Sequence, residues 1–248
     1  MVTPAEGIAL SVVIPCYNEG GNLDALAARC RAAAATMGAA ERVEFVLVDN
    51  GSRDDSAARL AALAAGDARF VVATVRENIG YGHGILTGLA AARGAVLAWT
   101  HADLQTDVGD VVAAYARWRA AAEPQRTLVR GRRTGRAALD ALFTGGMSVL
   151  ASAALGVPLH DINAQPKLFP RAFLAVMTHP PADFSLDLYA LYMARRAGWT
   201  VLEHPVHFGR RMAGEAKGGG TLRGKWRLIK RTAAYIVKLR AHLRAERA

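Results

Sequence analysis

Short apolar runs alternate with helical stretches along the first hundred residues of the chain. Four runs have the length and the Val, Ile and Leu content of buried strands, and they cover residues 10–15, 44–49, 70–75 and 95–100. Helices are predicted between them over residues 23–37, after residue 55 to about 65, and over 81–93. This alternation predicts a mostly parallel sheet in a Rossmann-like αβα sandwich, with helices on both faces.

Small polar residues and glycines mark the ends of these helices. Asn22 is the predicted N-cap of the first helix, and Asp54 or Asp55 that of the second, because short polar side chains accept the free amide hydrogens there. Gly38 and Gly94 are the predicted stops of the first and third helices.

The second half of the chain is less regular. Strands are predicted at residues 127–130, 165–169 and 200–206, and helices at 137–155 and 185–197. No element is predicted between Gln105 and Thr127. Because no repeat or low-complexity linker divides the chain, the pattern predicts one α/β domain over residues 1–217 and a C-terminal tail over residues 218–248.

Composition is that of an ordinary folded domain, with 52% hydrophobic and 21% charged residues. The only cysteines, Cys16 and Cys30, are too few for a disulfide scaffold and form no metal-ligand pattern, which fits a reducing, cytoplasmic setting. The N-terminus shows no signal-peptide pattern, and no run approaches the roughly 18 apolar residues of a membrane span.

The net charge of +10 is confined to the end of the chain. Residues 1–209 hold 19 basic and 19 acidic residues, whereas residues 210–248 hold 12 basic and 2 acidic ones. Apolar residues of this tail recur at helical spacing: Leu222, Trp226, Ile229, Ala233 and Ile236. A basic amphipathic helix of this kind is predicted to lie on an anionic membrane surface, at the inner face of the cytoplasmic membrane. Packing of the apolar stripe on the α/β domain, or on a partner helix, is the alternative.

Polar side chains gather where the predicted strands end. The four clusters are residues 17–19, 49–52, 78–84 and 101–105. In an open parallel sheet, ligands bind outside the carboxyl ends of the strands. The sequence therefore predicts a ligand site at that edge.

Eight short motifs occur in order along the chain. They are residues 14–19 (IPCYNE), 48–54 (VDNGSRD), 78–80 (NIG), 101–105 (HADLQ), 131–133 (GRR), 161–167 (DINAQPK), 203–206 (EHPV) and 211–217 (RMAGEAK). Together they resemble the family 2 glycosyltransferases of GT-A fold, in particular the dolichyl- and polyprenyl-phosphate mannosyltransferase branch. The resemblance covers about residues 10–217, which it implies to be a catalytic domain.

The resemblance implies a nucleotide-sugar site along the strand ends. The implied donor-binding residues are Pro15, Tyr17, Glu19, Asp49, Asn78, Gly80, His101, Ala102, Asp103 and Gln105. Asp103 and Gln105 are also the implied ligands of a divalent metal ion, Mn²⁺ or Mg²⁺, which would neutralise charge on the departing nucleoside diphosphate. Arg133, Arg211 and Lys217 match the family's cationic positions, which contact the donor diphosphate and the acceptor phosphate.

His101 departs from the family pattern, which usually has Asp-x-Asp at this turn. Imidazole binds transition metals such as manganese but is a poor ligand of magnesium, so His101 is a further candidate metal ligand. Alternatively, His101 makes only a hydrogen bond and the ion rests on Asp103, Gln105 and the phosphates. The sequence leaves both alternatives open.

The resemblance implies an inverting enzyme that moves a sugar from a nucleotide-diphosphate sugar to a polyprenyl-phosphate or lipid-linked acceptor. An ionised phosphate acceptor needs no strong base, whereas a sugar hydroxyl of a cell-surface glycan, the alternative acceptor, would need one. Asp161 is the first candidate for that base and Asp187 the second.

Two other classes of protein fit the sequence less well. A nucleotidyltransferase would have a Gly-rich phosphate loop with Arg after the first strand, where this chain has residues 16–19 (CYNE). A non-enzymatic nucleic-acid-binding protein would account for the basic tail. It would not account for the carboxylates at the strand ends, which repel nucleic acid, so no nucleic-acid partner is expected.

Overall fold

The computed structural model describes residues 7–38, 41–135, 138–209 and 222–245. The described strands form a seven-stranded sheet in the order β3-β2-β1-β4-β6-β5-β7. The strands are β1 (Ile8–Cys16), β2 (Arg42–Asn50), β3 (Phe70–Val75), β4 (Val96–Trp99), β5 (Thr127–Thr134), β6 (Lys167–Pro170) and β7 (Thr200–His207). The α-helices are α1 (Leu23–Ala35), α2 (Ser56–Gly66), α3 (Tyr81–Ala91), α4 (Gly109–Arg119), α5 (Ala138–Leu155), α6 (Leu186–Arg196) and α7 (Leu222–Ala245). The 3-10 helices are η1 (Gly20–Asn22), η2 (Pro124–Arg126) and η3 (Arg171–Ala175).

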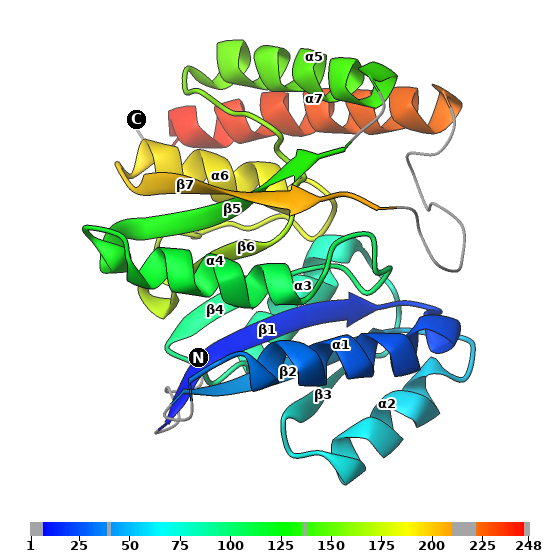
Figure 1. Ribbon diagram of the computed structural model, residues 1–248. Coiled ribbons are helices and arrows are strands. Elements are labelled where there is room, and N and C mark those ends of the chain that lie inside the picture. The colour runs from blue at the N-terminus through cyan, green and yellow to red at the C-terminus, as the bar shows by residue number, and fades with distance from the viewer. Residues whose placement is uncertain (1–6, 39–40, 136–137, 210–221, 246–248) are drawn as a thin grey trace.

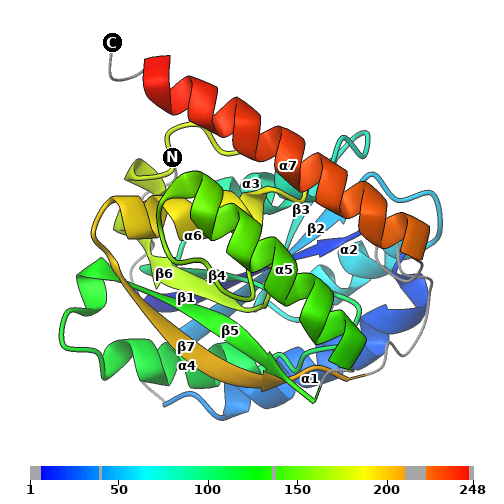
Figure 2. The ribbon, with the colours of Figure 1, turned by 90° about the horizontal axis from the view of Figure 1, so that it is seen from above.

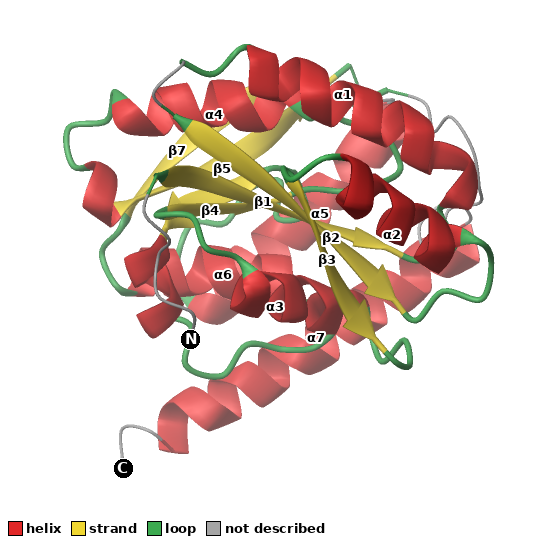
Figure 3. Ribbon diagram, turned by 90° about the horizontal axis from the view of Figure 1, so that it is seen from below, coloured by secondary structure: helices red, strands yellow, loops and turns green. Residues whose placement is uncertain are grey.

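Helices cover both faces of this sheet, as the sequence predicts (Figures 1 and 3). Alternate residues of β1 enter different cores: Val12 and Ile14 pack in the cluster with α1, α2 and α4, whereas Val13 packs with α3 and α6. Burial on both faces is the reason that β1 is apolar apart from Ser11, whose hydroxyl donates to Glu44 at 2.6 Å. The predicted αβα class is confirmed.

Strand β6 runs antiparallel to both of its neighbours, β4 and β5, while the other pairs are parallel. Its first residue, Lys167, pairs with Trp99, the last residue of β4. The segment that leads into β6, residues 161–166, therefore lies beside the turn that follows β4. This reversal brings a distant motif to the edge where the other strands end.

Helices α5 and α7 lie side by side and form an outer layer over α6 (Figures 1 and 2). Ile236 of α7 is buried in a cluster with Ala151 of α5 and Leu188 of α6. Part of the predicted apolar stripe thus packs on the protein, although Ala233 is exposed. The side chains of Leu222 and Trp226 lie outside the described residues.

The structure corrects two details of the prediction. Helix α4 falls in the stretch where no helix was predicted, and it buries Val111, Tyr115 and Trp118 at helical spacing. Asn22 occupies the N-cap position of α1, but its side chain donates to Glu19 Oε2 at 2.6 Å instead of capping the helix.

Of the two predicted caps of α2, Asp54 is the one whose side chain binds the start of the helix. Its Oδ1 accepts the amide hydrogen of Ser56, the first residue of the helix, at 3.1 Å. Asp55 holds the N-cap position without a side-chain bond.

Candidate active site

The loops that follow β1 and β2 are joined by hydrogen bonds. The Asn18 amide donates to Ser52 Oγ at 3.2 Å, and Asn18 Oδ1 accepts the amide hydrogen of Arg53 at 2.8 Å. Asn18 adopts a left-handed conformation, with φ of +53°, which suits an asparagine in a tight loop. The two loops therefore form one wall at the carboxyl edge of the sheet.

The candidate donor-binding residues of the first two strands lie on this wall. Asp49 is only 6% exposed, and its Oδ1 accepts the Ser52 amide hydrogen at 3.0 Å. Pro15, Tyr17 and Glu19 are half-buried along the end of β1 and its loop. The structure thus brings these four residues together, and their contact with a donor stays a prediction.

The loop after β3 closes against the same wall. A Cβ on Gly51, which has φ of +75°, would lie 2.6 Å from the amide nitrogen of Asn78, so only glycine allows this approach. Asn50, buried at the end of β2, donates through Nδ2 to the Gly80 carbonyl at 3.2 Å. Asn78 and Gly80 consequently lie beside the Asp49 loop, as predicted.

The turn after β4 holds the candidate metal ligands. Asp103 is 8% exposed, and its Oδ1 accepts the amide hydrogen of Gln105 at 3.2 Å. Leu104 between them has φ of +59°, so the turn is tight. Gln105 exchanges two hydrogen bonds with Gly209: its carbonyl accepts the Gly209 amide at 2.8 Å, and its Nε2 donates to the Gly209 carbonyl at 3.3 Å. Ala102 is buried beneath the turn.

Arg133, at the end of β5, is tied to Asp161. The Arg133 amide donates to Asp161 Oδ2 at 2.8 Å, and its Nε donates to Oδ1 at 2.9 Å, with Nη2 also bound to Oδ1. The guanidinium carbon lies 5.4 Å from the ring centre of Phe208. Asp161 has φ of +39°, in the left-handed region. The Asp161 carboxylate therefore orients Arg133, which leaves it poorly placed to act as a free general base.

Arg211 and Lys217 lie outside the described residues. Both belong to the segment between β7 and α7, and their implied phosphate contacts stay predictions. Gly209, the last described residue before them, bonds to Gln105 of the candidate metal turn.

Sequence reasoning missed a buried polar network behind this edge. Asp187 is 2% exposed and its Oδ1 accepts hydrogen bonds from Trp99 Nε1 at 3.1 Å, Gln165 Nε2 at 2.8 Å and Lys167 Nζ at 3.2 Å. Gln165 Nε2 also donates to the hydroxyl of Tyr81 at 3.1 Å. Gln165 and Lys167 fall in the motif at 161–167, which was the available signal. Asp187 holds these donors and is therefore not a free base.

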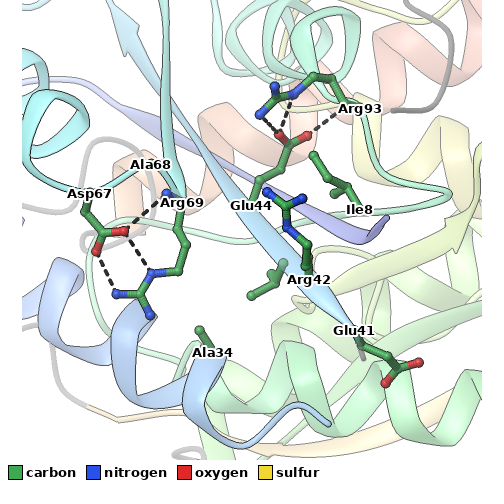
Figure 4. Close-up of a pocket in the computed structure, with 10 residues that line it drawn as sticks. Ile8, Ala34, Glu41, Arg42, Glu44, Asp67, Ala68, Arg69 and Arg93 are labelled. Carbon is green, nitrogen blue, oxygen red and sulfur yellow. Dashed lines mark hydrogen bonds and ion pairs between the residues drawn. The ribbon is translucent and has the colours of Figure 1, made fainter. Parts of the chain in front are cut away.

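A separate pocket lies at the opposite edge of the sheet, where the strands begin (Figure 4). Its charged groups largely bind one another. Glu44 accepts hydrogen bonds from the amide and Nε of Arg93, at 2.6 and 2.8 Å, and Asp67 binds Arg69 through two hydrogen bonds of 2.8 Å. These ion pairs stabilise the segments where the strands begin. The pocket therefore lies far from the predicted site, which is where the strands end.

The chain matches the family model described as glycosyl transferase family 2 over residues 11–128. It is 32% identical over 224 residues to a glycosyltransferase of Mycobacterium tuberculosis, covering 88% of this chain and 93% of that protein. It is 30% identical over 213 residues to the undecaprenyl-phosphate 4-deoxy-4-formamido-L-arabinose transferase of Shewanella sediminis. That match covers 85% of this chain but only 62% of the relative, so the chain spans less than two thirds of it.

Among solved structures, the fold is similar to glucosyl-3-phosphoglycerate synthase from Mycobacterium tuberculosis, crystallised with Mn²⁺, UDP-glucose and phosphoglyceric acid. The TM-score is 0.66 at 16% sequence identity, covering 94% of this chain and 79% of that one. At this identity the likeness establishes the fold, which is that of the GT-A glycosyltransferases. With the sequence relatives beside it, the conclusion is that this chain is an enzyme that belongs to glycosyl transferase family 2.

Proposed function

We propose that this protein moves a sugar, with inversion at the anomeric carbon, from a nucleotide-diphosphate sugar to a polyprenyl-phosphate or other lipid-linked acceptor. The observation that carries the proposal is the meeting of four predicted motifs at one edge of the sheet. They converge from β1, β2, β3 and β4, with the cation Arg133 from β5 beside them. The catalytic domain would be residues 1–217, with residues 218–248 as a helical appendage.

The donor would lie along the wall formed by the first three strand ends. Asp49 and Glu19 supply carboxylates that can accept hydrogen bonds from a base or ribose, and Tyr17 and Pro15 supply flat and apolar contacts. Asn78 and Gly80 would border the donor at the third strand end, where the missing Cβ of Gly80 leaves room for the Ala182 carbonyl, 2.3 Å from where that atom would lie.

A divalent ion fits this site if it binds together with the phosphates of the donor. The part of the chain that the structure describes contains no group of three or more His, Cys, Asp and Glu side chains placed to hold a metal. Asp103 offers one hard carboxylate and Gln105 an amide, so the donor phosphates would have to complete the ligand set. When bound, the ion would neutralise charge on the leaving nucleoside diphosphate. The structural neighbour that contains Mn²⁺ supports this proposal.

The acceptor is proposed from charge and from the ion pairs that the two candidate bases make. The two carboxylates considered as bases are both engaged, Asp161 with Arg133 and Asp187 with Lys167. A phosphate acceptor is already ionised and needs no base, and Arg133, Arg211 and Lys217 would hold it. The Shewanella relative, named for undecaprenyl phosphate, supports this acceptor class.

A thermal-shift screen of nucleotide sugars tests the donor site. The correct donor should raise the melting temperature in the presence of Mn²⁺ or Mg²⁺, because it binds only the folded state. At a concentration about a hundred times the dissociation constant, it should add about 2.7 kcal/mol, or roughly 5–10 °C. The free sugars serve as controls and should give no shift. If no nucleotide sugar shifts the transition with either metal, the proposal is wrong.

We also propose that the enzyme works at the inner face of the cytoplasmic membrane, where it would reach a lipid acceptor. No described helix is both long and apolar enough to cross a bilayer. However, Val149 and Leu150 on α5 and Val237 on α7 are 68%, 61% and 69% exposed on the outer helical layer. The cations Lys238 and Arg240 are exposed on the same helix as Val237. Exposed apolar residues beside basic ones favour binding to anionic lipid.

Replacing the three exposed residues with serine (Val149→Ser, Leu150→Ser, Val237→Ser) should weaken membrane binding. We expect partitioning onto phosphatidylglycerol vesicles to fall by about tenfold or more, because three apolar side chains leave the lipid interface. Sedimentation with vesicles measures the effect, and phosphatidylcholine vesicles serve as the uncharged control. Since the side chains are exposed, the melting temperature should not change. Unchanged binding to anionic vesicles would exclude this surface.

A further inference from the structure

In the buried network beside the site, the charge of Asp187 fixes which group donates and which accepts in each hydrogen bond. An ionised carboxylate can only accept hydrogen bonds, and Asp187 Oδ1 receives them from an indole, an amide and an ammonium group. The ammonium of Lys167, wholly buried, uses its three hydrogens on Asp187 Oδ1 and on the carbonyls of Ile162 and Ala164, at 2.8 and 2.7 Å. Asp187 Oδ1 and the Lys167 ammonium group thus form their hydrogen bonds within the protein.

The charge on Asp187 sets the orientation of the Gln165 amide. Its nitrogen must face the carboxylate at 2.8 Å, because an oxygen in that place would be repelled. The second hydrogen of this nitrogen then points to Tyr81 Oη at 3.1 Å. The Gln165 Oε1 atom is buried without a hydrogen-bond partner, which is the cost of this orientation.

Tyr81 is therefore an acceptor towards Gln165, and its own hydroxyl hydrogen must point elsewhere. The hydrogen bonds among the described residues include no acceptor for that hydrogen. A tyrosine hydroxyl is protonated at neutral pH, so this hydrogen is present and available to a ligand. Tyr81 is half-buried, and a tyrosine hydroxyl in such a place normally finds a partner for its hydrogen.

The ring of Tyr81 is held at the donor end of the site. Phe184 stacks on one side, with ring centres 4.9 Å apart and planes 8° apart, and the His101 ring lies 5.4 Å away. Tyr81 begins α3 directly after Gly80, and the amide of His83 donates to the Ala182 carbonyl at 2.8 Å. These contacts fix the ring between the turn that carries Asp103 and the loop that carries Phe184.

We propose that Tyr81 is a sugar-recognition residue, whose hydroxyl donates a hydrogen bond to an oxygen of the sugar being transferred. Gln165 and Asp187 act as positioning residues, since they force the hydroxyl hydrogen outwards. The inference rests on the proposed function and adds the contact that would distinguish the sugar from the nucleoside diphosphate. His101 takes part through its ring contact with Tyr81, which gives this departure from the family pattern a role other than metal binding.

A sugar oxygen suits this donor better than a phosphate oxygen. The phosphates carry full charge, and the resemblance assigns them to the metal ion and to Arg133, Arg211 and Lys217. The Tyr81 hydroxyl is neutral and cannot balance the charge of a phosphate. It can form a directional hydrogen bond with a neutral hydroxyl of the sugar. A site that is built to hydrogen-bond a substrate hydroxyl discriminates strongly against ligands without it.

The test compares a nucleotide sugar with its bare nucleoside diphosphate. Calorimetric titration with Mn²⁺ would use UDP-glucose against UDP and GDP-mannose against GDP, on the unmodified protein, on Tyr81→Phe and on Tyr115→Phe. In Tyr81→Phe, affinity for the sugar nucleotide should fall by about tenfold while affinity for the diphosphate stays within about twofold. Tyr115, on α4, donates to Glu41 at 3.1 Å far from the site, so its variant should leave both affinities unchanged.

The ratio of the two affinities separates a binding role from a structural one. A loss of folded Tyr81→Phe protein would lower both apparent affinities together and leave their ratio unchanged. If the unmodified protein binds a nucleotide sugar and Tyr81→Phe keeps the same ratio, Tyr81 is not a sugar-recognition residue and the proposed function stands. If the unmodified protein binds no nucleotide sugar, the proposed function fails and this inference falls with it.

Discussion

Replacing Asp103 with alanine should reduce sugar transfer by roughly a thousandfold or more, because several kcal/mol of charge stabilisation would be lost. Asp103 is the buried carboxylate of the turn after β4, and its Oδ1 is fixed by the amide of Gln105. Its removal would take a hard oxygen ligand from the place where the donor diphosphate is proposed to lie. Release of nucleoside diphosphate in the presence of a polyprenyl-phosphate acceptor measures the loss.

Two further variants make this test specific. Asp103→Asn keeps the size of the side chain but removes its charge, so it should be nearly as inactive as Asp103→Ala. Asp107 lies in the same loop, is exposed, and accepts the Gly109 amide hydrogen at 2.7 Å. Asp107→Ala should therefore keep activity within about twofold. A fully active Asp103→Ala would show that the active centre lies elsewhere.

Replacing Lys167 with methionine should lower the free energy of unfolding by about 3–5 kcal/mol, because it leaves Asp187 as an unpaired buried charge. Both side chains are almost wholly buried, and Lys167 also holds the carbonyls of Ile162 and Ala164. Burial lowers the pKa of Lys167, while the charge of Asp187 opposes that shift. The melting temperature should fall by roughly 10 °C in calorimetry.

The double variant Lys167→Met, Asp187→Leu should regain part of this loss, since it removes both charges from the interior. An exposed ion pair provides the contrast. Arg59 Nη2 binds Asp24 Oδ2 at 2.6 Å on the surface, and Arg59→Ala should leave the melting temperature unchanged. If Lys167→Met were as stable as the unmodified protein, the buried pair would not be what stabilises the loop before β6.

Local pattern was sufficient to predict most of the fold. The predicted third strand has the bounds of β3, Phe70–Val75, and the apolar runs at 10–15 and 44–49 lie inside β1 and β2. Strands β1 and β2 are buried on both faces, so their sequences are largely apolar and stand out from the helices. Helix α4 was missed even though Val111, Tyr115 and Trp118 have helical spacing. Its polar and alanine-rich surroundings weaken that signal.

The order of motifs also predicted the edge of the sheet where the strand-end residues meet, but not the partners of each side chain. The sequence makes Asp161 and Asp187 candidate bases, because it does not reveal whether a carboxylate is free or paired. The structure shows Asp161 bound to Arg133 and Asp187 bound to Lys167. Such pairs join residues 20 to 28 positions apart in the chain, and their geometry depends on how strands and loops pack.

Local periodicity and composition are enough to predict the alternation of strands and helices, the basic tail and the set of polar residues at the strand ends. Tertiary structure alone decided the reversal of β6, which places Gln165 beside the turn of Asp103. It also decided that Lys167 is buried, against the usual preference of lysine for the surface. A buried charge is tolerated only where distant residues supply its partners, and only the folded chain brings those partners together.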